Sequence, residues 1–338
     1  MVKADGYGHG ADACANAALE GGATRLAVAT AHEAEAIGRR LQHVPLLTMG
    51  ALTAADVDVA LAAGSEVAVW RQDFLQVVAD RASAQGRPAK VHLKLDSGMG
   101  RLGTTDPEEL LALVESCERD DHLTLSGVWT HFATADERGD DYFAEQLRRF
   151  EPLAEQVKAK HPEITVHAAN SAAVLRDPAA HFDMARCGIA IYGLDPFGED
   201  PAAQRLEPAL ELASYVADVK RFEAGDSAGY GRTWRAPGET FVGVLPIGYG
   251  DGVRRGLSNN AEVLVGGRRY PLVGTVSMDN VTIDLGPQTD VEAGAEAILI
   301  GAQGGERILC EELARALGTI NYEVTCGISA RVPREAAG

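Results

Sequence analysis

The chain has 338 residues, of which 46% are apolar and 24% are charged, and its formal net charge at pH 7 is −18. A chain of this length and composition can bury a large core, and the length predicts two domains. The negative charge repels a phosphate backbone, which excludes nucleic acid as the expected partner, and an anionic ligand would need local cations.

The five cysteines are scattered and odd in number, and they form no Cys-x-x-Cys pair. This pattern argues against a disulfide framework and a zinc site, and it is typical of a reducing compartment. No apolar run approaches the length of a membrane span, and the first ten residues do not have the pattern of a signal peptide. We therefore expect a cytoplasmic protein with no metal ion and no membrane partner.

In the first half of the chain, short apolar runs alternate with alanine-rich helical stretches. Eight strands are predicted: Val2–Lys3, Arg25–Thr30, Pro45–Gly50, Glu66–Trp70, Val91–Asp96, Leu123–Phe132, Ile164–Asn170 and Met184–Gly193. The predicted helices are Ala31–Leu41, Ala54–Ala63, Gln72–Gln85, Glu108–Arg119, Tyr142–Lys160 and Ser171–Arg176. Repeated strand–helix alternation implies a parallel sheet, and eight units predict a closed (β/α)8 barrel over residues 1–205, with a truncated first strand.

From about residue 206 the pattern changes to short strands separated by glycine turns. The predicted strands are Val216–Lys220, Phe241–Leu245, Ala261–Val265, Tyr270–Val273, Val281–Asp284 and Ala297–Ile300. The only predicted helix is Cys310–Leu317. We therefore expect a mostly-β domain over residues 206–338.

The predicted strand ends carry the residues most able to do chemistry. In a (β/α)8 barrel, reacting groups lie at the C-terminal ends of the strands, and phosphate often binds in the loops after strands seven and eight. Those loops hold Ser171 and the backbone N–H groups of Gly188 and Ile189, which suit a phosphate. The cations on the same rim are Lys3, Lys94, Arg101 and Arg186. Their convergence in an acidic protein indicates an anionic ligand.

A lysine opens the glycine-rich segment Lys3–Gly10. Most single lysines are solvated surface amines, but one in a partly dry cleft has a lowered pKa and can form a Schiff base with an aldehyde. The segment resembles the cofactor-binding lysine motif of the bacterial alanine racemases, with Gly6 where alanine is usual. The resemblance implies that Lys3 binds pyridoxal 5'-phosphate (PLP) covalently and that Tyr7 lies near its phosphate.

Four further segments of the first half resemble the same family: His92–Gly103, Thr130–Ala133, His167–Ala173 and Ala185–Gly193. The resemblance implies that Lys94, often carbamylated in the family, orients Arg101 toward the phenolic oxygen of the cofactor. It also implies that Arg186 bonds the pyridine nitrogen and His131. Because arginine keeps its proton, that nitrogen would stay unprotonated and be a weaker electron sink, which limits side reactions such as transamination.

The second half carries the family's remaining segments: Ser227–Trp234, Pro246–Gly252, Val273–Asn280 and Ile320–Val324. The resemblance implies that Tyr230 is the second catalytic base and that Tyr249 lines the path of the substrate. Met278 and Asp279 belong to the loop near the substrate carboxylate, where Ser277 replaces a frequent cysteine. The same comparison places Met278 and Arg101 against the substrate and Tyr322 near the cofactor phosphate.

Racemisation removes the α-proton from one face of the amino acid and returns a proton to the other, so a base is needed on each face. Lys3 and Tyr230 would be these bases. An unperturbed tyrosine with a pKa near ~10 is a poor base, so His131 is the candidate that draws its proton away. The resemblance implies supply of D-alanine for peptidoglycan by a homodimer in which the tyrosine comes from the partner subunit.

Other functions remain open from the sequence. The same chemistry could act on serine, lysine or a broad range of amino acids. A barrel that only carries PLP predicts no second domain and no base opposite Lys3, and a decarboxylase of similar architecture has motifs unlike the Lys3 and Tyr230 segments. Members of the family that it resembles normally carry about thirty further residues before the lysine motif. Either the start of this sequence is misplaced or truncated, or Lys3 is less well anchored than usual, and a PLP-binding protein with little turnover is then the alternative.

Overall fold

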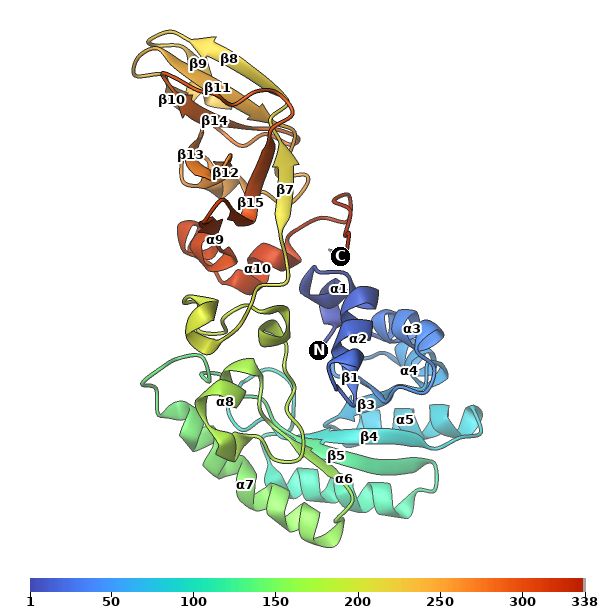
Figure 1. The fold of residues 1–338 in the computed structure, drawn as a ribbon. Coiled ribbons are helices and arrows are strands. Elements are labelled where there is room, and N and C mark those ends of the chain that lie inside the picture. The colour runs from blue at the N-terminus through green and yellow to red at the C-terminus, as the bar shows by residue number, and fades with distance from the viewer. Residues whose placement is uncertain (337–338) are drawn as a thin grey trace. The chain divides into compact units, whose positions relative to one another are not determined.

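The chain forms two units, Met1–Ile191 and Tyr192–Gly338, in the computed structural model, which describes residues 1–336 (Figure 1). Six parallel strands in sequential order build the sheet of the first unit. They are β1 (Leu26–Val28), β2 (Leu46–Thr48), β3 (Glu66–Val69), β4 (Ala89–Lys94), β5 (Leu123–Trp129) and β6 (Thr165–His167). Every residue of β1, β2 and β3 is buried, as expected of a parallel sheet covered on both faces.

Helices alternate with these strands. They are α1 (Lys3–Tyr7), α2 (Ala11–Glu20), α3 (Ala31–Arg40), α4 (Ala54–Ala62), α5 (Gln72–Ala84), α6 (Pro107–Arg119), α7 (Tyr142–Lys160) and α8 (Ser171–Arg176), with the 3-10 turns η1 (Pro178–Ala180) and η2 (Ile189–Tyr192). Capping boxes start α3 and α4: Thr30 and Thr53 each accept from the backbone N–H three residues on, where an acidic side chain returns the bond. The predicted bounds of α7 and α8 agree with the structure.

Two predicted barrel strands, Val2–Lys3 and Met184–Gly193, are not strands in the structure. The first turns directly into α1, and the second contains η2. Single backbone hydrogen bonds nevertheless hold both segments beside the sheet: Val2 donates to Ala27 at 2.9 Å, and Arg186 donates to Ala169 at 2.9 Å. The amino group of Met1 donates to the carbonyl of Cys187 at 2.9 Å and joins the two segments. The ring predicted for a (β/α)8 barrel is thus completed by irregular backbone.

The second unit is an antiparallel β structure, which confirms the change of fold class predicted from the sequence. Its strands are β7 (Leu212–Tyr215), β8 (Asp218–Phe222), β9 (Ser227–Ala228), β10 (Trp234–Arg235), β11 (Thr240–Leu245), β12 (Glu262–Val265), β13 (Arg268–Val273), β14 (Val281–Gly286), β15 (Glu296–Gln303) and β16 (Glu306–Ile308). The main sheet runs β16-β15-β12-β13-β14-β11-β8, β7 pairs with β15, and β9 pairs with β10.

The second unit also contains α9 (Cys310–Leu317), α10 (Asn321–Cys326) and the 3-10 turns η3 (Pro201–Gln204), η4 (Tyr230–Arg232) and η5 (Arg255–Leu257). The bounds of α9 agree with the prediction, whereas α10 was missed. Its six residues include Val324 and Thr325, which are β-branched and have a low helix propensity. The anchor of α10 is the buried Asn321, whose amide donates to the carbonyl of Asp195 and to the carboxylate of Glu311, both at 2.8 Å.

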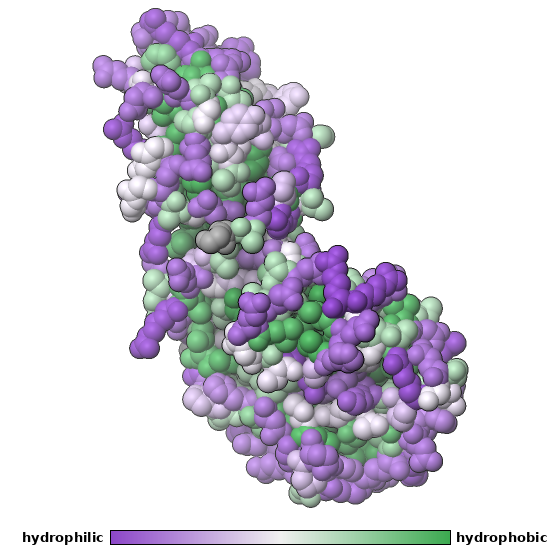
Figure 2. All heavy atoms as spheres, turned by 45° about the vertical axis from the view of Figure 1, so that its right-hand side comes forward, coloured by the Kyte–Doolittle hydropathy of each residue, from purple (hydrophilic) through white to green (hydrophobic). Residues whose placement is uncertain are grey.

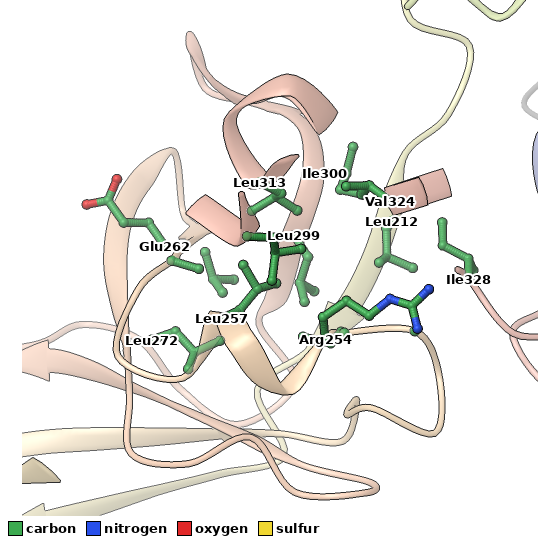
Figure 3. A pocket seen from close by; sticks show the side chains of 15 residues that line it. Leu212, Arg254, Leu257, Glu262, Leu272, Leu299, Ile300, Leu313, Val324 and Ile328 are labelled. Atoms are coloured by element: carbon green, nitrogen blue, oxygen red, sulfur yellow. The ribbon is translucent and has the colours of Figure 1, made fainter. Parts of the chain in front are cut away.

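A small apolar cavity of about 20 Å³ lies in the core of the second unit (Figure 3). Its lining includes Leu257, Leu272, Leu299 and Leu313, while the carboxylate of Glu262 points away from these side chains. A space of this size has room for about one water molecule, and an apolar lining gives such a water no partners. We therefore assign the cavity to core packing and not to a ligand.

The cap at the start of α4 gives a testable contribution to stability. Thr53→Ala removes the hydroxyl that accepts from the N–H of Asp56 at 3.2 Å, so we expect the free energy of unfolding to fall by about 1 kcal/mol. Denaturant titration measures this difference. Thr24→Ala, which deletes the same atoms at an exposed position outside a helix, should change it by less than about 0.5 kcal/mol. Equal losses in the two variants would contradict the assignment.

Candidate functional site

The lysine motif forms a left-handed turn. Ala4, Asp5 and Gly6 have φ between 51° and 62° and ψ between 43° and 52°, and Tyr7 also has a positive φ. Left-handed backbone costs roughly 1–2 kcal/mol for each residue that carries a Cβ. A segment with three such residues persists only when its surroundings fix it, and strain of this kind is concentrated at functional sites.

Two carboxylates fix the strained turn. Glu33 of the α3 capping box accepts from the backbone N–H of Ala4 at 2.7 Å with one oxygen and from that of Ala29 at 2.8 Å with the other. Asp5 accepts from the N–H of Ala11, the first residue of α2, at 2.8 Å. Sequence analysis did not assign Glu33 to the site. The capping box of a helix already accounts for a glutamate at this position, and the sequence gives no sign that this side chain also contacts the turn.

The turn places Lys3 and Tyr7 on the same side of the first unit. The Lys3 Nζ lies 5.9 Å from the centroid of the Tyr7 ring. The Tyr7 hydroxyl packs against the backbone of Gly188, where an added Cβ would lie only 2.3 Å from that oxygen. Glycine is therefore required at position 188 for the tyrosine hydroxyl to approach.

Ser171 joins this group from the start of α8. Its Oγ accepts from the backbone N–H groups of Gly188 at 2.9 Å and of Ala190 at 3.2 Å. A hydroxyl that accepts twice keeps its own proton for donation to another acceptor. Two hydroxyls, those of Tyr7 and Ser171, thus lie beside the backbone that leads into Ile189 and η2, which is the donor set an anionic oxygen needs.

Arg186 is buried in the first unit, among hydrogen-bond acceptors. Its Nη1 donates to His167 Nδ1 at 3.0 Å, and its Nη2 donates to His131 Nδ1 at 3.0 Å. The Nη2 also donates to the carbonyls of Thr130 at 2.8 Å and Ala168 at 2.9 Å. Burial lowers the pKa of Arg186 to about 9, at which the guanidinium is still charged at neutral pH. None of the four bonds uses Nε.

Burial and the neighbouring positive charge of Arg186 hold the pKa values of His131 and His167 well below the ordinary value. Both imidazoles are therefore neutral, and each accepts from Arg186 through Nδ1. Their single proton is accordingly on Nε2. The charges of Arg101, Lys94 and Lys3 lower the pKa of His131 further, which shows that the predicted cations act on one place in the barrel.

Lys94 ends β4 beside the same group, with its Nζ 4.6 Å from the centroid of the Trp129 ring. Burial, with the nearby positive charges of Arg101 and Arg186, lowers the Lys94 pKa to about 8. Trp129 also lies under Arg186, whose guanidinium carbon is 4.9 Å from the ring centroid. The electron-rich ring of Trp129 therefore lies within cation–π distance of both cations.

Arg101 is presented by a loop folded around one carboxylate. Asp96 accepts from the backbone N–H groups of Gly98, Met99 and Gly100 at 2.6–3.1 Å and from that of Arg101 at 2.9 Å. Burial alone would raise the pKa of Asp96, but these four bonds together lower it. The carboxylate thus stays charged and fixes the loop that carries Arg101.

In the second unit, Tyr230 opens η4 with 74% of its surface exposed. It lines a hollow of about 350 Å³ together with polar side chains that include Thr275, Ser277 and Asn280. The Thr275 hydroxyl donates to the carbonyl of Tyr230 at 2.8 Å. The backbone around this tyrosine is therefore fixed while its ring remains exposed.

Tyr249, Met278 and Asp279 lie on neighbouring turns of the second unit. The N–H of Tyr249 donates to the carbonyl of Ser277 at 3.0 Å. Met278 is 52% exposed and Tyr249 is 43% exposed. Asp279 pairs with Arg331 at 2.7 Å, an arginine that sequence analysis did not identify. Tyr322 is the second residue of α10, whose anchor is described above.

The structure thus brings together the predicted residues within each unit. In the first unit, Lys3, Tyr7, Ser171, Gly188 and Ile189 form one group, and Lys94, Arg101, His131 and Arg186 form the other. The second unit holds Tyr230, Tyr249, Met278, Asp279 and Tyr322. Within residues 1–336, no cluster of three or more His, Cys, Asp or Glu side chains could bind a metal ion, and no helix is long and apolar enough to cross a membrane.

Comparison with known protein families gives two matches that together cover nearly the whole chain. Residues 1–196 match the family described as alanine racemase, N-terminal domain, and residues 209–336 match alanine racemase, C-terminal domain. The alanine racemase of Symbiobacterium thermophilum is 44% identical over 335 residues, which cover 99% of this chain and 89% of that protein. The alanine racemase of Geobacillus stearothermophilus is 44% identical over 340 residues, covering 99% and 85%.

Solved structures agree with these matches. The crystal structure of the alanine racemase from D-cycloserine-producing Streptomyces lavendulae is similar with a TM-score of 0.93 at 35% identity, covering 100% of this chain and 89% of that one. The alanine racemase of Bacillus anthracis with bound L-Ala-P is similar with a TM-score of 0.87 at 39% identity, covering 98% and 86%.

The lowered pKa of Lys94 can be measured directly. At pH 8 we expect about half of the Lys94 amines to be neutral, against less than about 1% for an ordinary lysine. NMR of lysine labelled with ¹³C and ¹⁵N, titrated from pH 6 to 11, measures this fraction, and the Lys94→Arg spectrum assigns the signal. A Lys94 amine that titrates near its ordinary value of 10.5 would contradict the electrostatic reading of the site.

Proposed function

Because the chain belongs to the alanine racemase family, isomerases that interconvert the two enantiomers of alanine, we propose that it racemises alanine with PLP and two bases, Lys3 and Tyr230. The product would be D-alanine for peptidoglycan, made in the cytoplasm. We further propose that residues 1–205 form the cofactor-binding domain and that residues 206–338 supply the second base.

The donors around Gly188 fit the phosphate group of PLP. The observation that carries this proposal is the approach of the Tyr7 hydroxyl to Gly188, at a position where any Cβ would close the gap. Tyr7, Ser171 and the N–H of Ile189 would hold the phosphate, and Tyr322 would join them. When bound, PLP withdraws electrons from the α-carbon of the amino acid joined to it, so that the α-proton becomes acidic.

The same fit extends to the rest of the cofactor. Lys3 would be its covalent anchor, Arg101 would face its phenolic oxygen, and Arg186 would face its ring nitrogen. Arg186 fits this role because none of its four hydrogen bonds uses Nε. The guanidinium keeps its proton, so a ring nitrogen bonded to it stays unprotonated and side reactions are restrained.

Lys3 and Tyr230 would each accept and return a proton, on opposite faces of the substrate. The tautomer of His131 refines its role, because Nδ1 accepts from Arg186 and the proton is on Nε2. His131 would therefore donate a hydrogen bond to the Tyr230 oxygen and stabilise its deprotonated form, instead of removing the proton as a base. Arg101 and Met278 would contact the substrate, with Lys94, Tyr249 and Asp279 in support.

Exposed apolar side chains support a homodimer with shared sites. Tyr230, Tyr249 and Met278 are all exposed on neighbouring turns of the second unit. Figure 2 shows apolar patches among polar side chains on the molecule's surface. Exposed apolar groups framed by polar ones are typical of interaction surfaces. We therefore propose that the Lys3 site of one chain is completed by the partner's Tyr230.

Substitution of the two proposed bases tests the mechanism. In the chain loaded with PLP, Tyr230→Phe should lower kcat for alanine racemisation by about 10²- to 10⁴-fold, because general acid–base catalysis contributes that much. Lys3→Ala should remove the absorbance band of covalently bound cofactor as well as activity. Tyr215→Phe is the matched control, since Tyr215 is also an exposed tyrosine of the second unit. Equal activity of the two tyrosine variants would exclude Tyr230 as a base.

Mixed dimers test the shared site. Lys3→Ala and Tyr230→Phe chains are each expected to be inactive, but co-refolded in equal amounts they should regain about a quarter of the wild-type activity. Half of the dimers are then mixed, and each has one site with both bases intact. If Lys3 and Tyr230 of the same chain form the site, the mixture will show no recovery.

A further inference from the structure

We propose that Glu66, His92 and His167 form a hydrogen-bonded positioning chain that orients the Arg186 guanidinium from the opposite end of the barrel. The inference deepens the proposed function, because it identifies positioning residues for the arginine that would face the cofactor ring. None of the three belongs to the groups predicted from the sequence.

The positioning chain is continuous, and its side chains are buried. Glu66 is the first residue of β3, His92 lies in β4 and His167 ends β6. The Glu66 carboxylate lies 2.6 Å from His92 Nε2, and His92 Nδ1 lies 2.8 Å from His167 Nε2. His167 Nδ1 then meets Arg186 Nη1 at 3.0 Å. All four side chains are buried, so water does not compete for these bonds.

The two ends of the chain determine the position of every proton in it. Arginine can only donate, and a carboxylate can only accept. His167 must therefore accept through Nδ1 and donate through Nε2. His92 does the same toward Glu66, because its Nε2 lies 2.6 Å from the carboxylate but 3.2 Å from Arg25 Nη1, which itself donates to that carboxylate. This arrangement requires both imidazoles to be neutral, and burial lowers the pKa values of both.

Glu66 remains charged at the far end. Burial would raise its pKa, but the hydrogen bond from His92 and the positive charges of Arg25 and Lys90 together lower it. Arg25 also donates to the Glu66 carboxylate. The four direct partners of Arg186 are neutral imidazoles and carbonyls, so the carboxylate of Glu66 is the anion that the chain connects to this buried cation. Bonds in such a chain polarise one another.

The orientation of the His167 ring is fixed as well as the distances between the side chains of the positioning chain. The His167 ring stacks on Trp129 with centroids 5.6 Å apart and an interplanar angle of 8°. Arg186 lies over the same indole at 4.9 Å. A rotated His167 would lose both the stacking and its bond to Arg186. The geometry therefore sets the direction in which the guanidinium presents Nε.

The competing explanation is that these side chains only fill the barrel. Two variants of one residue separate the explanations. His92→Leu breaks the chain and leaves its neighbours unpaired, whereas the amide of His92→Gln can donate to Glu66 and accept from His167 in the same order. Thr48→Val is the control, since Thr48 forms a buried hydroxyl pair with Ser65 at 2.8 Å in the same barrel. If His92→Leu does not fold, Glu66→Gln removes the charge while keeping the shape.

The first measurement uses the protein without cofactor. In ¹⁵N spectra of histidine and arginine side chains, wild-type His92 and His167 should be neutral with protonated Nε2. His92→Leu should expose the Arg186 guanidinium protons to solvent exchange roughly tenfold faster, with His92→Gln and Thr48→Val within about twofold of wild type. A charged imidazole or the opposite tautomer in the wild type would overturn the proposal.

The second measurement uses the protein loaded with PLP. The His92→Leu variant, in which the positioning chain is broken, should have a kcat that is roughly tenfold lower, with little change in KM for alanine. The reason is that the misplaced Arg186 guanidinium would contact the cofactor and not the substrate. Rescue by His92→Gln is expected. If His92→Leu and Thr48→Val have the same kcat, the chain is only barrel filling. If the wild type does not bind PLP, the proposed function fails, while the exchange measurement still decides the positioning chain.

Discussion

The structure of the first unit depends on the burial of one positive charge. Arg186 cannot give up its proton at neutral pH, so every acceptor around it has to be supplied by the protein. Two carbonyls come from the ends of β5 and β6, and two imidazoles come from His131 and His167. This requirement explains why the strand ends around Arg186 carry histidines and an indole where a purely apolar core would pack more simply.

A second constraint acts at the lysine. The left-handed turn from Ala4 to Tyr7 is unfavourable in isolation, and the barrel stabilises it through Glu33, Asp5 and the backbone of Ala27. Gly6, which stands where alanine is usual in the family it resembles, has φ of 62° and accepts this conformation without the penalty of a Cβ. The fixed turn holds Lys3 and Tyr7 in one arrangement, which a flexible loop would not do.

The sequence predicted the fold well where apolar periodicity determines it. The buried strands β1 to β6 and the helices α7, α8 and α9 were all predicted, because each buries a continuous apolar run or a helical stripe. The strand predictions for Val2–Lys3 and Met184–Gly193 were wrong. The first segment enters a left-handed turn and the second contains a 3-10 turn, and neither kind of turn can be recognised from the spacing of apolar residues. The links among Glu66, His92 and His167 could not be predicted either, because pairing between distant strands depends on register, which a single sequence does not reveal.

The distribution of charge reconciles an acidic protein with an anionic ligand. A net charge of −18 gives a repulsive field at long range, but salt screens charges at the surface over a Debye length of about 8 Å. The cations Lys94 and Arg186 are buried, and screening is weaker there than at the surface. The four hydrogen-bond partners of Arg186 are neutral imidazoles and carbonyls, so none of them cancels its charge. The local field therefore favours an anionic ligand, and the negative exterior discourages polyanions from competing for the same place.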